Sequence, residues 1–504
     1  MNKIRNILFI MADQLRWDYL SCYGHPHLKT PHIDSLAKKG VQFESAFVQS
    51  PVCGPSRASY YTGRTVFSHG STWNQVPLPI GELTIGDYLR QSGIRTGVVG
   101  KTHMRPDLDG MSRLGITKDT EIGLIVSEPG FDPYERDDGL HPNNQIKNSK
   151  KTLSYNEWLN KLGYDGPNPW NDWANSAEGE NGEILSGWRL RNSNKPARIP
   201  EEHSETAFMT NRAMEFIEES KDKPWFLHLS YIKPHWPYMA PAPYHNMYSA
   251  NEFYPVHRND AERNNDHPVY KAFMENSISK TFSKDEVRNT VLSGYMGLIK
   301  QIDDNLGRLF KFLESSGHMD DTMIVFTSDH GDYQGDHWLG EKELFHEQSV
   351  RVPMIIYDPS EYANKTRGTK EQRFIDFSDY GRPLARLIAN SLKNTSFTPI
   401  QVTICFIISG LFGVFFIIKG YYWYAAFFLI LKSVLDAADG ELARMKKQPS
   451  YTGRYFDSIS DIILNALIFI SIWLVVNTNV WILVFSFFGL QLQGTLYNYY
   501  YTIL

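Results

Sequence analysis

The chain has 504 residues, with 51 Lys and Arg against 56 Asp and Glu and a formal net charge of −5 at pH 7. This length exceeds the roughly 100 to 200 residues of one domain and predicts at least two. The near balance of charge excludes a global basic field for nucleic acid, so no nucleic acid partner is expected. Cys22, Cys53 and Cys405 are too few and too far apart for a disulfide framework, which is typical of a reducing compartment.

The first apolar stretch lies in MNKIRNILFIMADQ. It has only about six apolar residues before Asp13 and no small-residue cleavage site, so we interpret it as a buried strand and expect no signal peptide. The soluble part of the chain is therefore expected in the cytoplasm.

Strand-like runs alternate with helical patterns up to about residue 358. The strand-like runs are NILFIMA, RTGVVG, PWFLHLSYI, DTMIVFTSD and VPMIIYD. Short β-branched runs separated by helices predict an α/β sandwich around a central, mostly parallel sheet. In such sheets, ligands collect at the carboxyl ends of the strands.

Polar clusters follow three of these strands, at Asp13-Gln14, Lys233-Pro234-His235 and Asp329-His330. A single Asp or His there is more often a turn or cap residue, but three clusters at one sheet edge indicate a site. The candidate metal ligands are Asp13, Gln14, Asp329 and His330. This mixed carboxylate, amide and imidazole set favours calcium or manganese over a thiolate-type zinc site.

A candidate nucleophile lies in SPVCGPSRASYYTGR, where Cys53 follows an apolar strand and precedes an expected helix. Arg57 would lie one turn further along, and the helix N-terminus itself attracts anions. The alternative for Cys53 is a small packed hydrophobic residue.

CGPSRASYYTGR matches the C-x-P-S-R signature of the type I sulfatases. The resemblance extends through MADQLRWDYLSCYG, GKTH, HLSYIKPHWPY and TSDHGDYQGDH, and covers about residues 4 to 358. The chain is thus similar to formylglycine sulfatases and phosphonate monoester hydrolases of the alkaline phosphatase-like superfamily. This implies an alkaline phosphatase-like sandwich that hydrolyses sulfate, phosphonate or phosphate esters.

The sulfatase resemblance also implies partners and residue roles. A formylglycine-generating or sulfatase-maturing enzyme would oxidise Cys53 to formylglycine, Cys53 would also face the metal, and Arg57 would stabilise the aldehyde hydrate. A second copy of this chain, forming a homodimer, is a further possible partner. Around the sulfate and leaving group the resemblance places Lys101, His103, His235 and Lys342, with Asn74 as a substrate-binding residue.

Two of these positions bear on proton transfer and on the substrate. His103 and His235 are candidate proton donors, because the pKa of histidine lies near neutrality. Lys101-Thr102-His103 stands where the phosphonate hydrolases carry Tyr-Thr-Thr, and this difference favours a sulfatase-type pocket that neutralises sulfate directly.

The composition becomes mostly apolar near Ile400. Residues 400–418 carry no charge over about 19 residues, enough to cross a hydrocarbon core of roughly 30 Å. Shorter apolar runs follow at 421–435, 462–476 and 480–504. Four runs in succession predict an all-α transmembrane domain of about four helices rather than buried soluble helices.

Basic residues lie before the first of these runs and between the second and third. They are Arg382, Arg386, Lys393, Arg444, Lys446, Lys447 and Arg454. The positive-inside rule places these segments in the cytoplasm. We therefore expect a multi-pass protein of the cytoplasmic (inner) membrane, with the hydrolase domain on the cytoplasmic side.

The segment 436–461, DAADGELARMKKQPSYTGRYFDSISD, fits D-x2-D-G-x2-A-R-x8-G-x3-D-x3-D. Spacings of three and four place Asp436 with Asp439, and Asp457 with Asp461, on one face of each helix. Four close carboxylates need cations, so we expect a magnesium or manganese pair that binds a pyrophosphate. Two helices with solvated acidic faces are the alternative.

This pattern resembles the CDP-alcohol phosphatidyltransferase family, which makes phosphodiesters in phospholipid synthesis with release of CMP. The implied partners are a CDP-activated lipid or alcohol and membrane lipid. The resemblance implies Asp436, Asp439 and Asp457 as metal ligands and Asp461 as both ligand and base. It implies Gly440, Arg444 and Gly453 as the residues that hold the CDP group.

The two resemblances divide the chain into three parts. A sulfatase-like domain without the usual C-terminal subdomain is expected at residues 1–362, a linker at 363–376, and a truncated phosphatidyltransferase-like domain at 377–504. Two alternatives to a working fusion stay open. One is a junction of incomplete modules with one or both activities lost, and the other is a membrane-anchored, non-catalytic binding protein.

Overall fold

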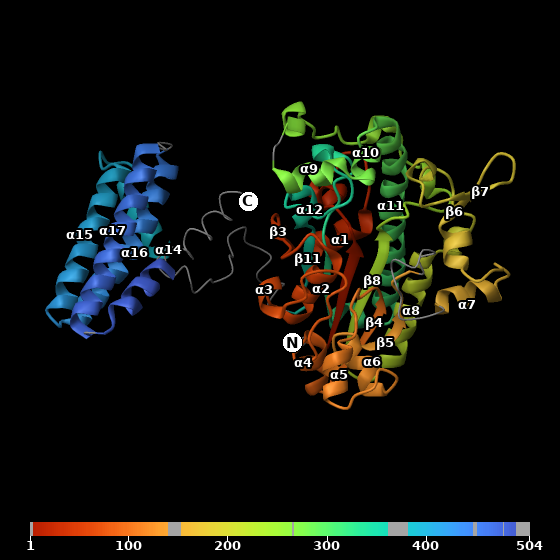
Figure 1. Cartoon of the computed structure of the whole chain (residues 1–504), viewed down its shortest axis with the longest axis horizontal. Helices are drawn as coiled ribbons and strands as arrows, with labels where there is room; N and C mark the ends of the chain where they lie inside the picture. The colour runs from red at the N-terminus through yellow and green to blue at the C-terminus, as the bar shows by residue number, and fades with distance from the viewer. Residues whose placement is uncertain are drawn as a thin grey trace. The chain divides into compact units, whose positions relative to one another are not determined.

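The computed structural model describes residues 4–139, 153–264, 267–360, 382–446, 451–476 and 478–489 (Figure 1). The chain divides into two compact units, Met1–Gly368 and Thr369–Leu504. The predicted linker, residues 363–376, lies outside the described residues.

The first unit is built on a seven-stranded sheet with the order β2-β11-β9-β1-β8-β4-β5. Its strands are β1 (Asn6–Asp13), β2 (Val41–Gln42), β4 (Arg95–Gly100), β5 (Asp132–Arg136), β8 (Trp225–Pro234), β9 (Thr322–Ser328) and β11 (Met354–Tyr357). The five strands from β9 to β5 are parallel, whereas β11 runs antiparallel to both β9 and β2. The predicted α/β fold with a mostly parallel sheet is therefore confirmed.

The central strand β1 shows how the sheet becomes the middle layer of a sandwich. Leu8, Ile10 and Ala12 belong to one buried apolar cluster, and Phe9 and Met11 belong to another, because successive side chains of a strand point to opposite faces. The first cluster includes residues of α1 (Pro31–Lys39), α8 (Glu205–Ser220) and α11 (Asp285–Ser315), and the second includes residues of α2 (Cys53–Thr62) and α4 (Ile85–Gln91). Helices thus cover both faces, as in other α/β layers.

Shorter elements complete the first unit. The strand pairs are β3 (Ala46–Phe47) with β10 (Arg351–Val352) and β6 (Ser176–Glu178) with β7 (Ile184–Ser186). The remaining α-helices are α3 (Val66–His69), α5 (Leu108–Arg113), α6 (Glu121–Ser127), α7 (Ser154–Lys161), α9 (Pro268–Glu275), α10 (Ser277–Phe282) and α12 (Glu347–Val350).

The register of the parallel strands brings distant polar residues to one edge of the sheet. Asp13 is the partner of Pro234 on β8, and Ala12 is the partner of Ser328 on β9. His235 and Asp329 follow these partners directly in the chain. The carboxyl edge of β1, β8 and β9 therefore collects the polar clusters noted in the sequence.

The second unit is helical within its described residues. Its helices are α14 (Arg382–Leu392), α15 (Pro399–Ile418), α16 (Tyr422–Met445) and α17 (Tyr451–Val476). Thr398 caps α15 in a capping box with Gln401, and Pro399 occupies its first turn. Gly410 and Gly413 leave room for close packing, since a Cβ there would meet Leu464 at 2.8 Å and Leu429 at 2.7 Å.

Two helices of this unit are long and apolar enough to cross a membrane, among the residues that the structure describes. They are Pro399–Ile418 and Ile459–Val476, and a shorter apolar helix covers Val480–Gly489. The run predicted at 421–435 lies within α16, which continues into the DAADG segment. The all-α character is confirmed, whereas four membrane spans stay a prediction.

Candidate active sites

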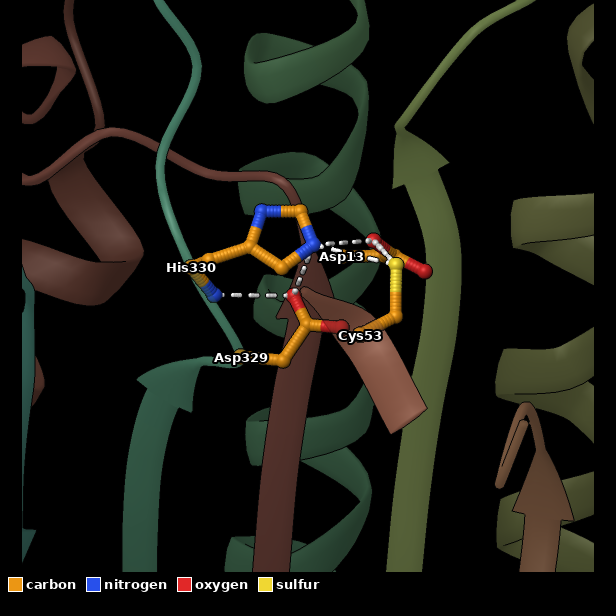
Figure 2. A group of neighbouring side chains, drawn as sticks. All are labelled: Asp13, Cys53, Asp329 and His330. Atoms are coloured by element: carbon orange, nitrogen blue, oxygen red, sulfur yellow. Dashed lines mark hydrogen bonds and ion pairs between the residues drawn. The ribbon is translucent and has the colours of Figure 1, made fainter. Parts of the chain in front are cut away.

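Four buried side chains meet at the carboxyl edge of the sheet (Figure 2). Asp13 ends β1, Asp329 and His330 follow β9, and Cys53 is the first residue of α2. Their possible ligand atoms all lie within 4.8 Å of one another. His330 Nε2 lies 3.0 Å from Cys53 Sγ, 3.8 Å from Asp13 Oδ1 and 3.7 Å from Asp329 Oδ1.

The chemistry of this group fits a divalent cation. The backbone carbonyl of Gly331 lies 2.8 Å from His330 Nδ1 and accepts a hydrogen bond from it, which leaves Nε2 facing the carboxylates as a metal ligand would. Gln14 adopts a left-handed backbone conformation with φ 65°, and its N–H donates to Asp329 Oδ1 at 3.0 Å. The predicted ligands Asp13, Asp329 and His330 are therefore brought together with Cys53, and the backbone of Gln14 is bonded to Asp329.

Three cationic side chains surround the group, and each is at most 5% exposed. Arg57 Nε donates to Asp329 Oδ2 at 2.8 Å, and Arg57 Nη2 lies 3.4 Å from Asp13 Oδ2. Lys101 forms an ion pair with Asp13. Lys342 Nζ donates to the side-chain oxygen of Gln14 at 2.8 Å. These three cations and the four residues of the buried group are called the pocket below, and the cations place positive charge close to the candidate nucleophile.

These cations change the acid–base properties of the pocket. Burial alone would raise the pKa of the Cys53 thiol, but Lys342, Lys101 and His330 outweigh burial and hold it well below its ordinary value. Burial lowers the pKa of His330, yet the adjacent Asp329 and Cys53 raise it to about 9. A low thiol pKa is the condition under which a cysteine is reactive.

His235 lies beside the same pocket. Its Nδ1 is 2.7 Å from the backbone carbonyl of Trp236, to which it donates, and its Nε2 is 3.2 Å from Lys342 Nζ. Burial, followed by the charges of Lys342 and Lys101, lowers the pKa of His235 to about 3. His235 is therefore neutral at pH 7, and it can donate a proton from Nε2 only after an anion raises this pKa.

His103 and Asn74 contact the first turn of α2 and the neighbouring loop. His103 has φ 55°, its N–H donates to Asp138 Oδ1 at 3.2 Å, and its buried Nδ1 has no hydrogen-bond partner. The side-chain oxygen of Asn74 accepts from the backbone N–H of Gly54 at 2.8 Å, directly after Cys53. All the predicted hydrolase residues thus lie around one pocket, and their individual roles stay predictions.

Two residues that the sequence did not single out hold Gln14 in place. Gln14 Nε2 donates to Asp332 Oδ2 at 2.5 Å and lies 3.2 Å from the hydroxyl of Tyr238. Asp332 follows His330 by two residues in SDHGD, so its proximity to the strand end was a usable signal. Tyr238 lies three residues after His235 in HLSYIKPHWPY, which was a similar signal, but only the tertiary fold shows its contact with Gln14.

In the second unit, two of the predicted transferase carboxylates have polar partners that the sequence analysis did not name, and the assembly of these carboxylates into one site stays a prediction. Asp439 on α16 accepts from the hydroxyl of Thr403 on α15 at 2.7 Å. Asp461 on α17 accepts from Lys432 Nζ at 2.5 Å and from Asn465 Nδ2 at 3.0 Å. Asp436 lies on α16, as do Gly440 and Arg444, while Gly453 and Asp457 lie on α17. The surroundings of Gly440 and Gly453 and the side chains of Arg444 and Asp457 are outside the described part of the chain.

The sequence analysis did not predict that Lys432 contacts the candidate transferase residue Asp461. It lies one helical turn before Asp436 and is 9% exposed, with Nζ 5.0 Å from the centre of the Phe406 ring. A lone lysine in an apolar helix, four residues before an aspartate, was the available signal, because ionisable residues in such helices are usually paired and functional.

Comparison with known proteins assigns a family to each part of the chain. A family model for sulfatases matches residues 5–388, and one for CDP-alcohol phosphatidyltransferases matches residues 396–502. The chain is 33% identical over 398 residues to the multifunctional alkaline phosphatase superfamily protein PehA of Trinickia caryophylli, covering 74% of this chain and 72% of that protein. It is 28% identical over 387 residues to an arylsulfatase of Clostridium perfringens, covering 74% and 73%.

A solved structure supports the same assignment. The phosphonate monoester hydrolase of Agrobacterium radiobacter aligns with a TM-score of 0.59 at 28% identity, covering 70% of this chain and 68% of that one. The transferase match and the two apolar helices suggest association with a membrane. The chain therefore belongs to the sulfatase family, within the alkaline phosphatase-like superfamily, and carries a CDP-alcohol phosphatidyltransferase domain at residues 396–502.

Proposed function

We propose that the first unit hydrolyses sulfate esters by means of a formylglycine formed from Cys53. One observation carries this proposal: Cys53 Sγ lies within the same buried group as two carboxylates and an imidazole, 3.0 Å from His330 Nε2. A non-catalytic binding protein would not need a buried nucleophile and a cation site together. The ligands of the calcium or manganese ion would be Asp13, Gln14, Asp329, His330 and the modified Cys53.

The groups absent from the structure supply two kinds of chemistry. The hydrate of a formylglycine at residue 53 would supply a nucleophilic oxygen and a second hydroxyl, and a cation held by the ligands named above would polarise the ester oxygens. The residues of the chain neutralise the charge of the substrate and hold the ligands in place. Lys101 and Lys342 face the pocket as ammonium groups and neutralise the anionic oxygens of the ester. Arg57 holds Asp13 and Asp329 in place through ion pairs with both carboxylates.

His235 and His103 are the proposed sources of the leaving-group proton. His235 would take up a proton when an anionic ester enters beside it, because added negative charge raises the pKa of an imidazole. It would then donate from Nε2 to the departing oxygen. The loss of activity in His235→Gln should be larger for esters of alkyl alcohols than for esters of nitrophenol, whose leaving group needs no proton.

Sulfate is the preferred substrate, and phosphonate monoesters are the second candidate. Lys101 and His103 favour sulfate, whereas similarity to a phosphonate monoester hydrolase favours the other class. The test uses the full chain, purified from its host or with a maturing enzyme, and mass spectrometry of the Cys53 peptide. Formylglycine at residue 53 with faster turnover of an aryl sulfate than of an aryl phosphonate supports the proposal. Unmodified cysteine in an active preparation contradicts the mechanism.

For the second unit we propose transfer of a phosphoalcohol group from a CDP-activated donor, with release of CMP. Asp436 and Asp439 on α16 and Asp461 on α17 favour it, since carboxylates of two neighbouring helices, joined here by the bond from Lys432 to Asp461, can hold a magnesium or manganese pair. The measurement is CMP release from a CDP-lipid by the purified chain, with a panel of acceptor alcohols. No CMP release with any acceptor would support the alternative of an inactive module.

We also propose a location for the protein, which rests on the distribution of its basic residues. The basic residues around α14 and between α16 and α17 favour a multi-pass protein whose hydrolase unit faces the cytoplasm. Labelling of single cysteines placed at Lys393 and Asn479, in intact and in permeabilised cells, tests this arrangement. Reaction at position 393 in intact cells with a membrane-impermeant reagent would contradict it.

A further inference from the structure

The side-chain amide of Gln14 has a defined orientation in this structure. Its nitrogen, Nε2, donates to Asp332 Oδ2 at 2.5 Å and lies 3.2 Å from the Tyr238 hydroxyl. Its oxygen, Oε1, accepts from Lys342 Nζ at 2.8 Å, on the side of the pocket. The two ends of the amide therefore face two different environments, one made of acceptors and one of cations.

Asp332 is itself fixed by several donors. The Tyr238 hydroxyl donates to Asp332 Oδ2 at 2.7 Å, Gln334 Nε2 donates to the same oxygen at 2.7 Å, and the Gln334 backbone N–H donates to Oδ1 at 3.0 Å. Asp332 is completely buried. The Tyr238 hydroxyl has given its hydrogen to Asp332, so toward Gln14 it can only accept.

Rotating the amide of Gln14 by half a turn would be unfavourable at both ends. Oε1 would then face the Asp332 carboxylate and the Tyr238 oxygen, which are both acceptors. Nε2 would face Lys342, which is a donor, and it would also face the cation if Gln14 is a ligand as proposed. Of the two ends of an amide, only the oxygen can bind a cation.

We propose that Asp332 is a positioning residue that makes Gln14 present its amide oxygen to the metal and to Lys342. This inference rests on the proposed role of Gln14 as a metal ligand. Partners that orient a ligand in this way commonly change metal affinity by about 10 to 100-fold when they are substituted. Asp332 touches neither substrate nor metal in this proposal, and it acts through Gln14.

The first experiment measures metal affinity at this site, independently of turnover. The full chain in detergent, freed of metal by a chelator, is titrated with Mn²⁺ and with Ca²⁺, and hydrogen exchange of the peptides containing Gln14 and His330 reports binding at the first unit alone. Asp332→Asn should weaken binding at least tenfold, because the Asn amide can turn its NH₂ toward Gln14. Asp336→Asn, a buried aspartate of the same loop that pairs with Arg16, is the matched control and should change affinity less than threefold.

A second pair of variants separates orientation from simple damage to the fold. Gln14→Glu places a carboxylate against the Asp332 carboxylate and should bind metal poorly. In the double variant with Gln14→Glu and Asp332→Asn, the Asn amide can donate to the new carboxylate, so metal affinity should recover at least tenfold over Gln14→Glu alone. A structural defect would not be repaired by a second substitution.

The outcomes distinguish this inference from the proposed function. Unchanged affinity in Asp332→Asn, or no recovery in the double variant, would overturn the role of Asp332 while the metal site stands. Protection of neither peptide by Mn²⁺ or Ca²⁺ in the unsubstituted chain would overturn both. A tenfold loss in Asp332→Asn with recovery in the double variant is the expected result.

Discussion

The two candidate sites of this chain are assembled in opposite ways. In the first unit, the backbone of Gln14 bonds to Asp329, 315 residues further along, and strand register decides which residues meet. In the second unit, Asp436 and Asp439 lie on one helix, and Asp457 and Asp461 on another, so helical spacing alone places each pair. The first site therefore depends on the whole sheet, and the second on the packing of a few helices.

The largest effect is expected when the candidate nucleophile of the first unit is replaced, and it should fall on one of the two activities only. Cys53→Ala should lower ester hydrolysis on the order of 10⁴-fold or more, because no oxygen or sulfur remains at the end of that side chain to attack. CMP release by the same preparation should stay unchanged. Cys22→Ala removes a partly buried cysteine outside the pocket and is the matched control. Equal loss in both cysteine variants would show that the effect came from folding.

The reciprocal experiment acts on the second unit. Asp461→Asn should lower CMP release by roughly 10² to 10⁴-fold, the contribution typical of a general base, because an amide cannot accept the proton of the incoming alcohol. Hydrolysis of the ester should be unaffected. A drop in both activities would contradict the view that the two sites work independently.

The same contrast decides how much could be predicted from the sequence. The DAADG segment and the C-x-P-S-R signature are local patterns, so Asp436, Asp439, Cys53 and Arg57 could be proposed from their resemblance to the motifs of two families. The mostly parallel sheet also followed from the alternation of strands and helices. The contacts of Tyr238 and Asp332 with Gln14 were missed because they form only after β1, β8 and β9 have aligned, although each residue lies close in the chain to a predicted site residue. Lys432 was missed because it lies outside the aspartate pattern, although a lone lysine in an apolar helix was a usable signal.

A smaller effect is expected at a contact between helices of the second unit. Thr403→Val replaces the hydroxyl that donates to Asp439 at 2.7 Å by a methyl group of similar size. We expect CMP release or metal affinity to fall by about 10 to 100-fold, as for other partners of metal-binding carboxylates. Ser409→Ala is the control, because this serine is on the same helix, similarly buried, and donates to the backbone of Phe428 instead. Similar losses in both variants would mean that only helix packing was disturbed.

The smallest effect concerns the stability of the first unit in acid. It distinguishes the two units, because all 16 histidines precede residue 361 and therefore belong to the first unit. His228 is fully buried, its Nε2 is 3.0 Å from the Tyr61 hydroxyl, and burial together with the charge of Arg57 lowers its pKa to about 3. The unfolded chain binds this proton at its ordinary pKa of about 6.5, whereas the folded chain does not. The unfolding free energy should therefore fall as the pH falls from about 6.5 toward 3.

Each such histidine contributes at most about 1.4 kcal/mol per pH unit to this slope. Urea unfolding of the full chain in detergent, followed by fluorescence between pH 7 and pH 5, measures the slope. His228→Gln should reduce the slope by up to this amount at the acid end of the range, whatever its effect on the stability at pH 7. His27→Gln alters an exposed histidine and should leave the slope unchanged. An unchanged slope in His228→Gln would mean that the acid sensitivity of the first unit does not arise in this strand of the core.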